Sequence, residues 1–149
     1  MPTIIGPIRH DGVLVSVEVG LGSAAVHALR AQHKAVPPAI QKTGLIDSGA
    51  EITTLDTALV QQMRQQLGLQ YLTVIPSTAP ALGFNGIAVV YPIGFVILHP
   101  QGQHLVNRTL LIQELPISQL GYDVLIGRDV LASCRFVYEG RAGQFEVSY

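Results

Sequence analysis

The sequence predicts a single domain that consists mostly of β-strands and has one well-defined helix. Residues 13–19 alternate between valine and other residues, which is typical of a strand with one buried face. Residues 145–149 repeat this alternation behind a glycine-containing turn, which indicates a C-terminal hairpin. Residues 55–68 most clearly combine a helical period with start and stop signals. A chain of 149 residues fits one domain, residues 1–149.

The first third of the chain is expected to contain two strands around a short helix. Glycines end the first strand, and Ser23 is predicted to cap a helix in which Val26 and Leu29 share a face. Two consecutive prolines then stop any helix. Residues 41–46 are expected to form the next strand, which ends at Asp47.

The clearest helix begins after Asp56, whose side chain suits the N-cap position. Val60, Met63 and Leu67 recur at helical spacing and form the predicted buried stripe. Gly68 is the expected C-terminal stop.

The second half reads as strands that are separated by turns. Residues 78–86 are rich in turn formers yet carry apolar side chains, so we expect a projecting hairpin tip that serves as a lid over a ligand. A short helix is expected after Gly127, with Cys134 on its apolar side. The predicted strands are residues 87–91, 93–98, 105–112, 122–126, 135–138 and 144–149.

Composition excludes several classes of protein. The net charge is -1 and no basic run occurs, which argues against a nucleic-acid partner. The longest apolar stretch, residues 87–98, is interrupted by Pro92 and is shorter than the ~18 residues of a membrane helix. The first residues lack the pattern of a signal peptide, and the single cysteine suits a reducing compartment, so a cytoplasmic protein is expected.

Metal and cofactor chemistry have little support in the sequence. The five histidines are scattered, with no partners at metal-ligand spacing. His99 and His104 flank a turn and are expected to be solvated. No phosphate-binding glycine loop is present, and Cys134 reads as a core residue. We therefore expect neither a metal nor a cofactor.

The most informative stretch is residues 44–51, Gly-Leu-Ile-Asp-Ser-Gly-Ala-Glu. An apolar strand end leads directly to Asp47, which places this acid at the end of a buried strand and in front of a cleft. Gly49 allows a sharp turn and a close approach of the backbone to a ligand. Asp-Ser-Gly is also a common turn sequence by itself, because both polar side chains can bond to their own backbone.

A second stretch, Val-Leu-Ile-Gly-Arg-Asp-Val-Leu at residues 124–131, gives the first its context. Together with residues 45–50, it resembles the retropepsin-like aspartic proteases, the single-domain relatives of pepsin. The first stretch is similar to the Asp-Thr/Ser-Gly-Ala catalytic loop of that family, and the second to its apolar-apolar-Gly element. The resemblance covers nearly the whole chain and implies a closed β-barrel lobe, with one clear helix after the catalytic loop and a short one after Gly127.

The resemblance also implies an activity, the hydrolysis of peptide bonds in a polypeptide substrate. Two neighbouring carboxylates share a proton, so that one activates water as a base while the other acts as an acid; aspartic proteases are the standard example of such a dyad. Because this chain has only Asp47 in such a loop, a homodimer would supply the second carboxylate.

Further roles follow from the same resemblance. Ser48 would brace the two loops across the dimer, and Gly49 would leave room for the substrate backbone. Glu51 and Arg128 would form an ion pair between the two motifs, whereas Asp129 is expected to be an acid at a helix start. The implied substrate-binding residues are Ala50, Glu51, Thr78, Ala79, Ala81, Leu82 and Gly83.

Two matters remain open at the level of the sequence. A catalytically inactive member of the same fold, acting as a dimerisation or peptide-binding module, is the alternative to the enzyme, because fold does not imply activity. The dimer sheet could use either chain end; we expect residues 145–149 to form it, since their alternation offers an apolar face at a free end.

Overall fold

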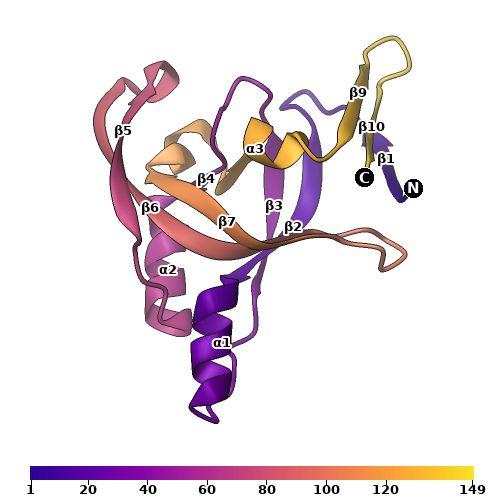
Figure 1. Cartoon of the computed structure of the whole chain (residues 1–149). Coiled ribbons are helices and arrows are strands. Elements are labelled where there is room, and N and C mark those ends of the chain that lie inside the picture. The colour runs from indigo at the N-terminus through magenta and orange to yellow at the C-terminus, as the bar shows by residue number, and fades with distance from the viewer.

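The computed structural model, which describes residues 1–149, is built around a closed β-barrel (Figure 1). Six strands follow one another around it, and pairing of the first with the last closes the ring. A seventh strand, β5 (Thr73–Ala79), extends the sheet beyond β6. This arrangement confirms the predicted fold class. In barrel order the strands are β2 (Leu14–Leu21), β3 (Ile40–Ile46), β8 (Val124–Ile126), β4 (Thr54–Asp56), β7 (Leu105–Leu115) and β6 (Phe84–Ile97).

The alternating valines of β2 point into the barrel, as their pattern predicts. Val17 and Val19 are completely buried, and they belong to one hydrophobic core with Phe95 and Ile97 of β6. β2 and β6 come very close together at Gly94, where an added Cβ would lie 2.8 Å from the Leu21 carbonyl oxygen. Closure of the barrel therefore depends on the missing side chain at this position.

β6 is one long strand where the sequence predicted two. Its first half pairs with β5 and its second half with β2, while β7 runs along its other edge. Pro92 lies between these two partners, opposite Leu111 of β7. A proline is tolerated there because its missing N–H faces the edge of β6 where the pairing with β5 has ended and the pairing with β2 has not begun.

Two helices flank the barrel (Figure 1). α2 (Thr57–Leu67) begins and ends at the predicted caps, Asp56 and Gly68, and buries the predicted stripe. α1 (Ser23–Ala31) forms where expected, but its N-cap is Gly22 and Ser23 is the first helical residue, so the predicted cap is wrong by one position. No helix in the chain has both the length and the apolar character needed to cross a membrane.

The chain ends meet in a separate three-stranded sheet (Figure 1). β10 (Gln144–Ser148) lies between β1 (Thr3–Pro7) and β9 (Arg135–Glu139). Both edges of β10 are therefore occupied within its own chain, so residues 145–149 have no free strand edge for the dimer sheet expected of them. The free edges of this terminal sheet belong to β1 and β9.

Asp56, which is only 2% exposed, connects the end of β4 to two other parts of the fold. One carboxylate oxygen accepts the Ala58 N–H of α2 at 2.9 Å. The other accepts the Ser118 N–H at 2.7 Å, in the short 3-10 helix η2 (Ile117–Leu120).

We expect Asp56→Ala to lower the free energy of unfolding by about 2–3 kcal/mol, because it removes the N-cap acceptor of the Ala58 N–H and the carboxylate that accepts the Ser118 N–H. Urea denaturation measures this change. Thr57→Ala at the exposed neighbouring position is the matched control and should change stability by less than about 0.5 kcal/mol. A similarly small effect of Asp56→Ala would contradict the bridging role.

Candidate active site

Asp47 is the first residue after β3, as the sequence predicts. β3 runs parallel to β8, with Ile46 opposite Ile126. The Asp47 N–H donates to the Ile126 carbonyl oxygen at 2.9 Å, which continues the pairing by one more bond. The position of Asp47 is thus set by the pairing of β3 with β8.

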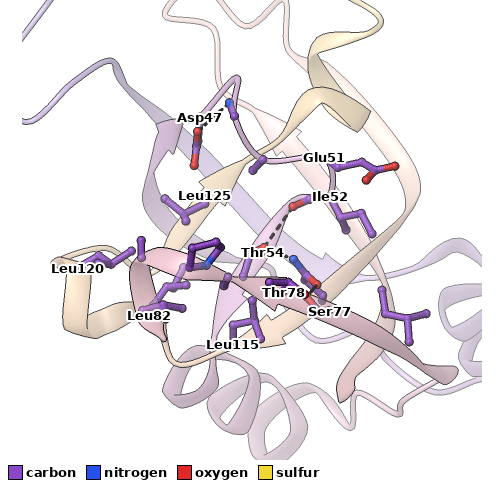
Figure 2. Close-up of a pocket in the computed structure, with 18 of the residues that line it drawn as sticks. Asp47, Glu51, Ile52, Thr54, Ser77, Thr78, Leu82, Leu115, Leu120 and Leu125 are labelled. Carbon is purple, nitrogen blue, oxygen red and sulfur yellow. Dashed lines mark hydrogen bonds between the residues drawn. The ribbon is translucent and has the colours of Figure 1, made fainter. Parts of the chain in front are cut away.

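The loop after β3 also orients the Asp47 side chain. Asp47 Oδ1 accepts the Gly49 N–H at 2.9 Å, and the Asp47 carbonyl oxygen accepts the Ala50 N–H at 3.1 Å. The side chain is half-buried, and Figure 2 shows it at one end of a cleft. Ser48 is exposed and lies outside this cleft.

The second motif packs directly against this loop. A Cβ on Gly127 would lie 2.8 Å from the carbonyl carbon of Ile52 and 2.9 Å from the nitrogen of Thr53. Only glycine permits this approach. The Arg128 N–H then donates to the Ala50 carbonyl oxygen at 2.8 Å. The two stretches that the sequence singled out therefore lie side by side.

Asp129 and Thr53 bind the two motifs together through their side chains. The Asp129 carboxylate accepts the Thr53 N–H at 2.9 Å and the Thr53 hydroxyl at 2.7 Å. The Thr53 Oγ1 in turn accepts the buried Gly127 N–H at 3.0 Å. Asp129 does stand in the first turn of α3 (Arg128–Leu131), as expected, but this bonding was missed, since nothing in the spacing of the two residues indicates it.

The predicted ion pair between Glu51 and Arg128 is absent. Both side chains line the cleft, but the two salt bridges of the chain are Lys42–Asp123 and Arg135–Glu146. Backbone hydrogen bonds already join the segments that carry Glu51 and Arg128. Both residues are exposed, so an ion pair would add only about 0–1 kcal/mol.

The cleft has a volume of about 470 Å³ and lies between the Asp47 loop and the β5–β6 hairpin (Figure 2). Gly83, a predicted substrate contact, is outside it, at the end of the 3-10 helix η1 (Pro80–Leu82). The predicted residues that do line it are Asp47, Gly49, Ala50, Glu51, Thr78, Ala79, Ala81, Leu82 and Arg128. Pro80 also lines it and lies within the predicted tip, residues 78–86. Sequence reasoning missed Ile52, Thr54, Ile75, Pro76, Ser77, Gln113, Leu115, Ile117, Leu120 and Leu125.

A hairpin tip forms in the predicted region, but its first strand, β5, was not predicted and the tip is not simply exposed. β5 and β6 pair from Thr73–Val90 to Ala79–Phe84, and η1 makes the tip. Leu82 and Phe84 are half-buried and pack against a small cluster that includes Leu115, Ile117 and Leu125. The tip is therefore folded onto one wall of the cleft.

The histidine pair forms a structural contact. His99, expected to be solvated, is only 7% exposed. The backbone N–H of His99 donates to His104 Nδ1 at 2.9 Å, and His99 Nδ1 accepts the Gln101 N–H at 3.0 Å. Its Nε2 lies 3.1 Å from the Thr3 carbonyl oxygen. The ring thus links the β6–β7 turn to β1.

The sequence also led to expectations for the remaining metal-ligating and nucleophilic side chains. No group of three or more histidine, cysteine or acidic residues is placed to hold a metal ion. Burial raises the pKa of the Cys134 thiol, which keeps it in the protonated, weakly nucleophilic form at neutral pH.

Comparison with known proteins supports the fold. No protein-family model matches the chain, and no curated protein matches it by sequence. Among solved structures, it is similar to a retropepsin-like aspartic protease from Rickettsia conorii, with a TM-score of 0.57, 15% identity, and coverage of 99% of this chain and 90% of that one. The retroviral protease-like domain of Ddi1 from Leishmania major gives a TM-score of 0.42 at 11% identity, covering 91% of this chain and 93% of that one. The chain has a retropepsin-like fold.

We expect Thr53→Val to destabilise the protein by about 2–4 kcal/mol, because it removes a hydroxyl that serves Asp129 and leaves the buried Gly127 N–H without an acceptor. Thr53→Ser, which keeps the hydroxyl, should retain most of the stability. Thermal and urea unfolding of both variants provide the measurement. Unchanged stability of Thr53→Val, which keeps the methyl group, would contradict the role of these hydrogen bonds.

Proposed function

We propose that this protein is a homodimeric aspartic endopeptidase, in which Asp47 of each subunit contributes one carboxylate to a shared active site. The observation that carries the proposal is the placement of Asp47. Its carboxylate is oriented by the Gly49 N–H and faces a cleft that the β5–β6 hairpin closes on the opposite side. The similarity of the fold to that of a retropepsin-like aspartic protease supports the proposal.

The reaction needs an acid and a base, and a carboxylate pair provides both. Two like charges at about 3 Å cannot both be ionised cheaply, so the pair holds one proton. The ionised carboxylate takes a proton from the water molecule that attacks the carbonyl carbon of the peptide bond. The protonated carboxyl group donates a proton to the departing amine. The pair titrates as a unit. No cofactor is required for these steps.

Two other aspartates of the same chain are already engaged in structural hydrogen bonds. Asp129 belongs to the second motif, but its carboxylate accepts the N–H and the hydroxyl of Thr53. Asp56 is buried and caps α2. These bonds favour a partner subunit as the source of the second carboxylate.

The arrangement of the chain suits a two-fold partner. Figure 1 shows the loop after β3, the tip of the β5–β6 hairpin and the terminal sheet on the same side of the molecule. The β1 edge of the terminal sheet is free, and Ile5 on this strand is 64% exposed. A partner that covers this side would bury Ile5 and bring the two Asp47 loops together.

The proposed substrate is a polypeptide segment in extended conformation. Such a segment can lie between the Asp47 loop and β5, with side chains alternating between the two walls of the cleft. The seven leucine and isoleucine residues that line the cleft favour aliphatic side chains next to them.

We expect Asp47→Asn to reduce cleavage of a complex peptide library by about 10²- to 10⁴-fold over acidic to neutral pH, because the amide can neither take nor give the proton. Mass spectrometry of the products measures cleavage and reveals side-chain preferences. Asp11→Asn, at an exposed aspartate outside the cleft, is the matched control and should cleave normally. Cleavage that persists in Asp47→Asn would exclude the proposed mechanism.

A mixing experiment tests the shared active site. When wild-type chains are refolded with a ninefold excess of Asp47→Asn chains, random pairing leaves only about one tenth of the wild-type chains in fully active dimers. We therefore expect about one tenth of the activity at saturating substrate, whereas the same excess of an inert carrier protein should leave activity unchanged. Activity unaffected by the excess would mean that each chain works alone.

The inactive binding module remains the alternative, and one result would favour it. A protein that binds peptides as a dimer, but cleaves none of them at any pH, would have the cleft without the catalysis.

A further inference from the structure

Three polar side chains form a connected group in the wall of the cleft. Ser77 Oγ donates to Gln113 Oε1 at 2.8 Å, Gln113 Nε2 donates to Thr54 Oγ1 at 3.0 Å, and Thr54 Oγ1 donates to the Ile52 carbonyl oxygen at 3.1 Å. The residues belong to β5, β7 and β4 and all line the cleft. Figure 2 marks bonds of this group with dashed lines.

The group is held in place before any ligand binds. Thr54 is only 2% exposed and lies directly opposite Gln113 in the parallel β4–β7 ladder. The Gln113 N–H donates to the Thr53 carbonyl oxygen at 3.1 Å, which fixes the backbone at this position. The side chains of Gln113 and Ser77 are half-buried and reach the cleft from two different strands.

The bonding fixes the orientation of the Gln113 amide. Because the Thr54 proton goes to the Ile52 carbonyl oxygen, this hydroxyl is an acceptor toward Gln113, so the amide nitrogen faces Thr54 and the amide oxygen faces Ser77. An amide has two N–H donors and two oxygen lone pairs. After the bonds to Ser77 and Thr54, one donor and one lone pair of Gln113 are left for a ligand.

The other wall of the cleft has the opposite character. In Figure 2, Leu82, Leu120 and Leu125 lie toward the left of the cleft, while Ser77 lies toward the right. An aliphatic ligand side chain next to Gln113 would displace water from the free N–H and lone pair of the Gln113 amide. It could form no hydrogen bonds in place of those lost. Sites built to form hydrogen bonds reject ligands that cannot form them more strongly than apolar sites reject extra polar groups.

We propose that Gln113 is a specificity-determining residue, which together with Ser77 and Thr54 makes a subsite for a carboxamide side chain, asparagine or glutamine, of the bound peptide. The inference rests on the proposed function, because it takes the cleft to be a peptide-binding site. A carboxamide offers one donor group and one acceptor group, and so matches what Gln113 has left. A carboxylate has no donor for the free lone pair of the Gln113 oxygen, and an ammonium group has no acceptor for the free Gln113 N–H.

Peptide selection on the Asp47→Asn protein tests this subsite without cleavage of the ligands. Randomised peptides are displayed and bound to Asp47→Asn, to Asp47→Asn/Gln113→Leu and to Asp47→Asn/Gln65→Leu, where Gln65 is an exposed residue of α2 outside the cleft. We expect asparagine or glutamine to be enriched about tenfold at one peptide position with the first and third proteins. With Gln113→Leu, aliphatic residues should replace them at that position only, and preferences elsewhere in the peptide should remain.

Gln113→Leu also removes two internal bonds, so a second variant separates specificity from folding. Ser77→Ala removes one partner of Gln113 and leaves its amide in the cleft, so the carboxamide preference should weaken but remain. Thermal unfolding verifies that each variant is folded at the selection temperature. Any of three results would overturn the proposal. These are an unchanged preference after Gln113→Leu, the absence of any carboxamide enrichment, and the absence of peptide binding.

Cleavage by the wild-type protein separates this proposal from the proposed function. Cleavage of peptides without a carboxamide preference would support the peptidase and overturn the subsite. Carboxamide-dependent binding without cleavage by the wild-type protein would support the subsite and contradict the peptidase.

Discussion

The contact between Thr53, Asp129 and the Gly127 N–H is the constraint on which the site depends. It joins two segments that lie far apart in the sequence, and it leaves neither a buried hydroxyl nor a buried N–H without a partner. The absent side chain of Gly127 allows the two backbones to approach closely enough for these bonds. With both segments fixed, the loop before Thr53 needs only the Gly49 N–H to aim the Asp47 carboxylate at the cleft. The orientation of the Asp47 carboxylate is thus a consequence of the packing between these two segments.

The other side of the cleft is formed by the β5–β6 hairpin. β5 is an edge strand, and the hairpin tip rests on the Leu115, Ile117 and Leu125 cluster through Leu82 and Phe84. The bond between Ser77 and Gln113 adds a polar attachment on the other side. A peptide that enters between the hairpin and the Asp47 loop would meet both kinds of surface, so the element that closes the cleft would also contribute to selecting its ligand.

Local signals were sufficient for most of the fold. The alternation of β2, the cap at Asp56 and the stop at Gly68 each depend on neighbouring residues, and the structure agrees with all three. Interactions between distant residues were not predictable in this way. The burial of His99, the bond from Thr53 to Asp129 and the central place of β10 depend on which strands meet, and sequence spacing does not encode this.

The same division applies to the site. The Asp47 loop and the Gly127 element were recognisable because each is a short continuous pattern, whereas Gln113 and Ser77 stand alone in strands whose pairing places them in the cleft. The Glu51–Arg128 ion pair was expected from resemblance, but backbone bonds already join these segments and both side chains are exposed.

The most direct test of the central claim is a crystal structure of the protein in its solution assembly, with the separation of the two Asp47 carboxylates as the measured quantity. The account predicts a two-fold dimer in which the nearest oxygen atoms are about 2.5–3.0 Å apart, within the range of a shared O–H···O hydrogen bond. A monomer, or a dimer whose Asp47 carboxylates are separated by more than about twice that hydrogen-bond distance, would contradict it.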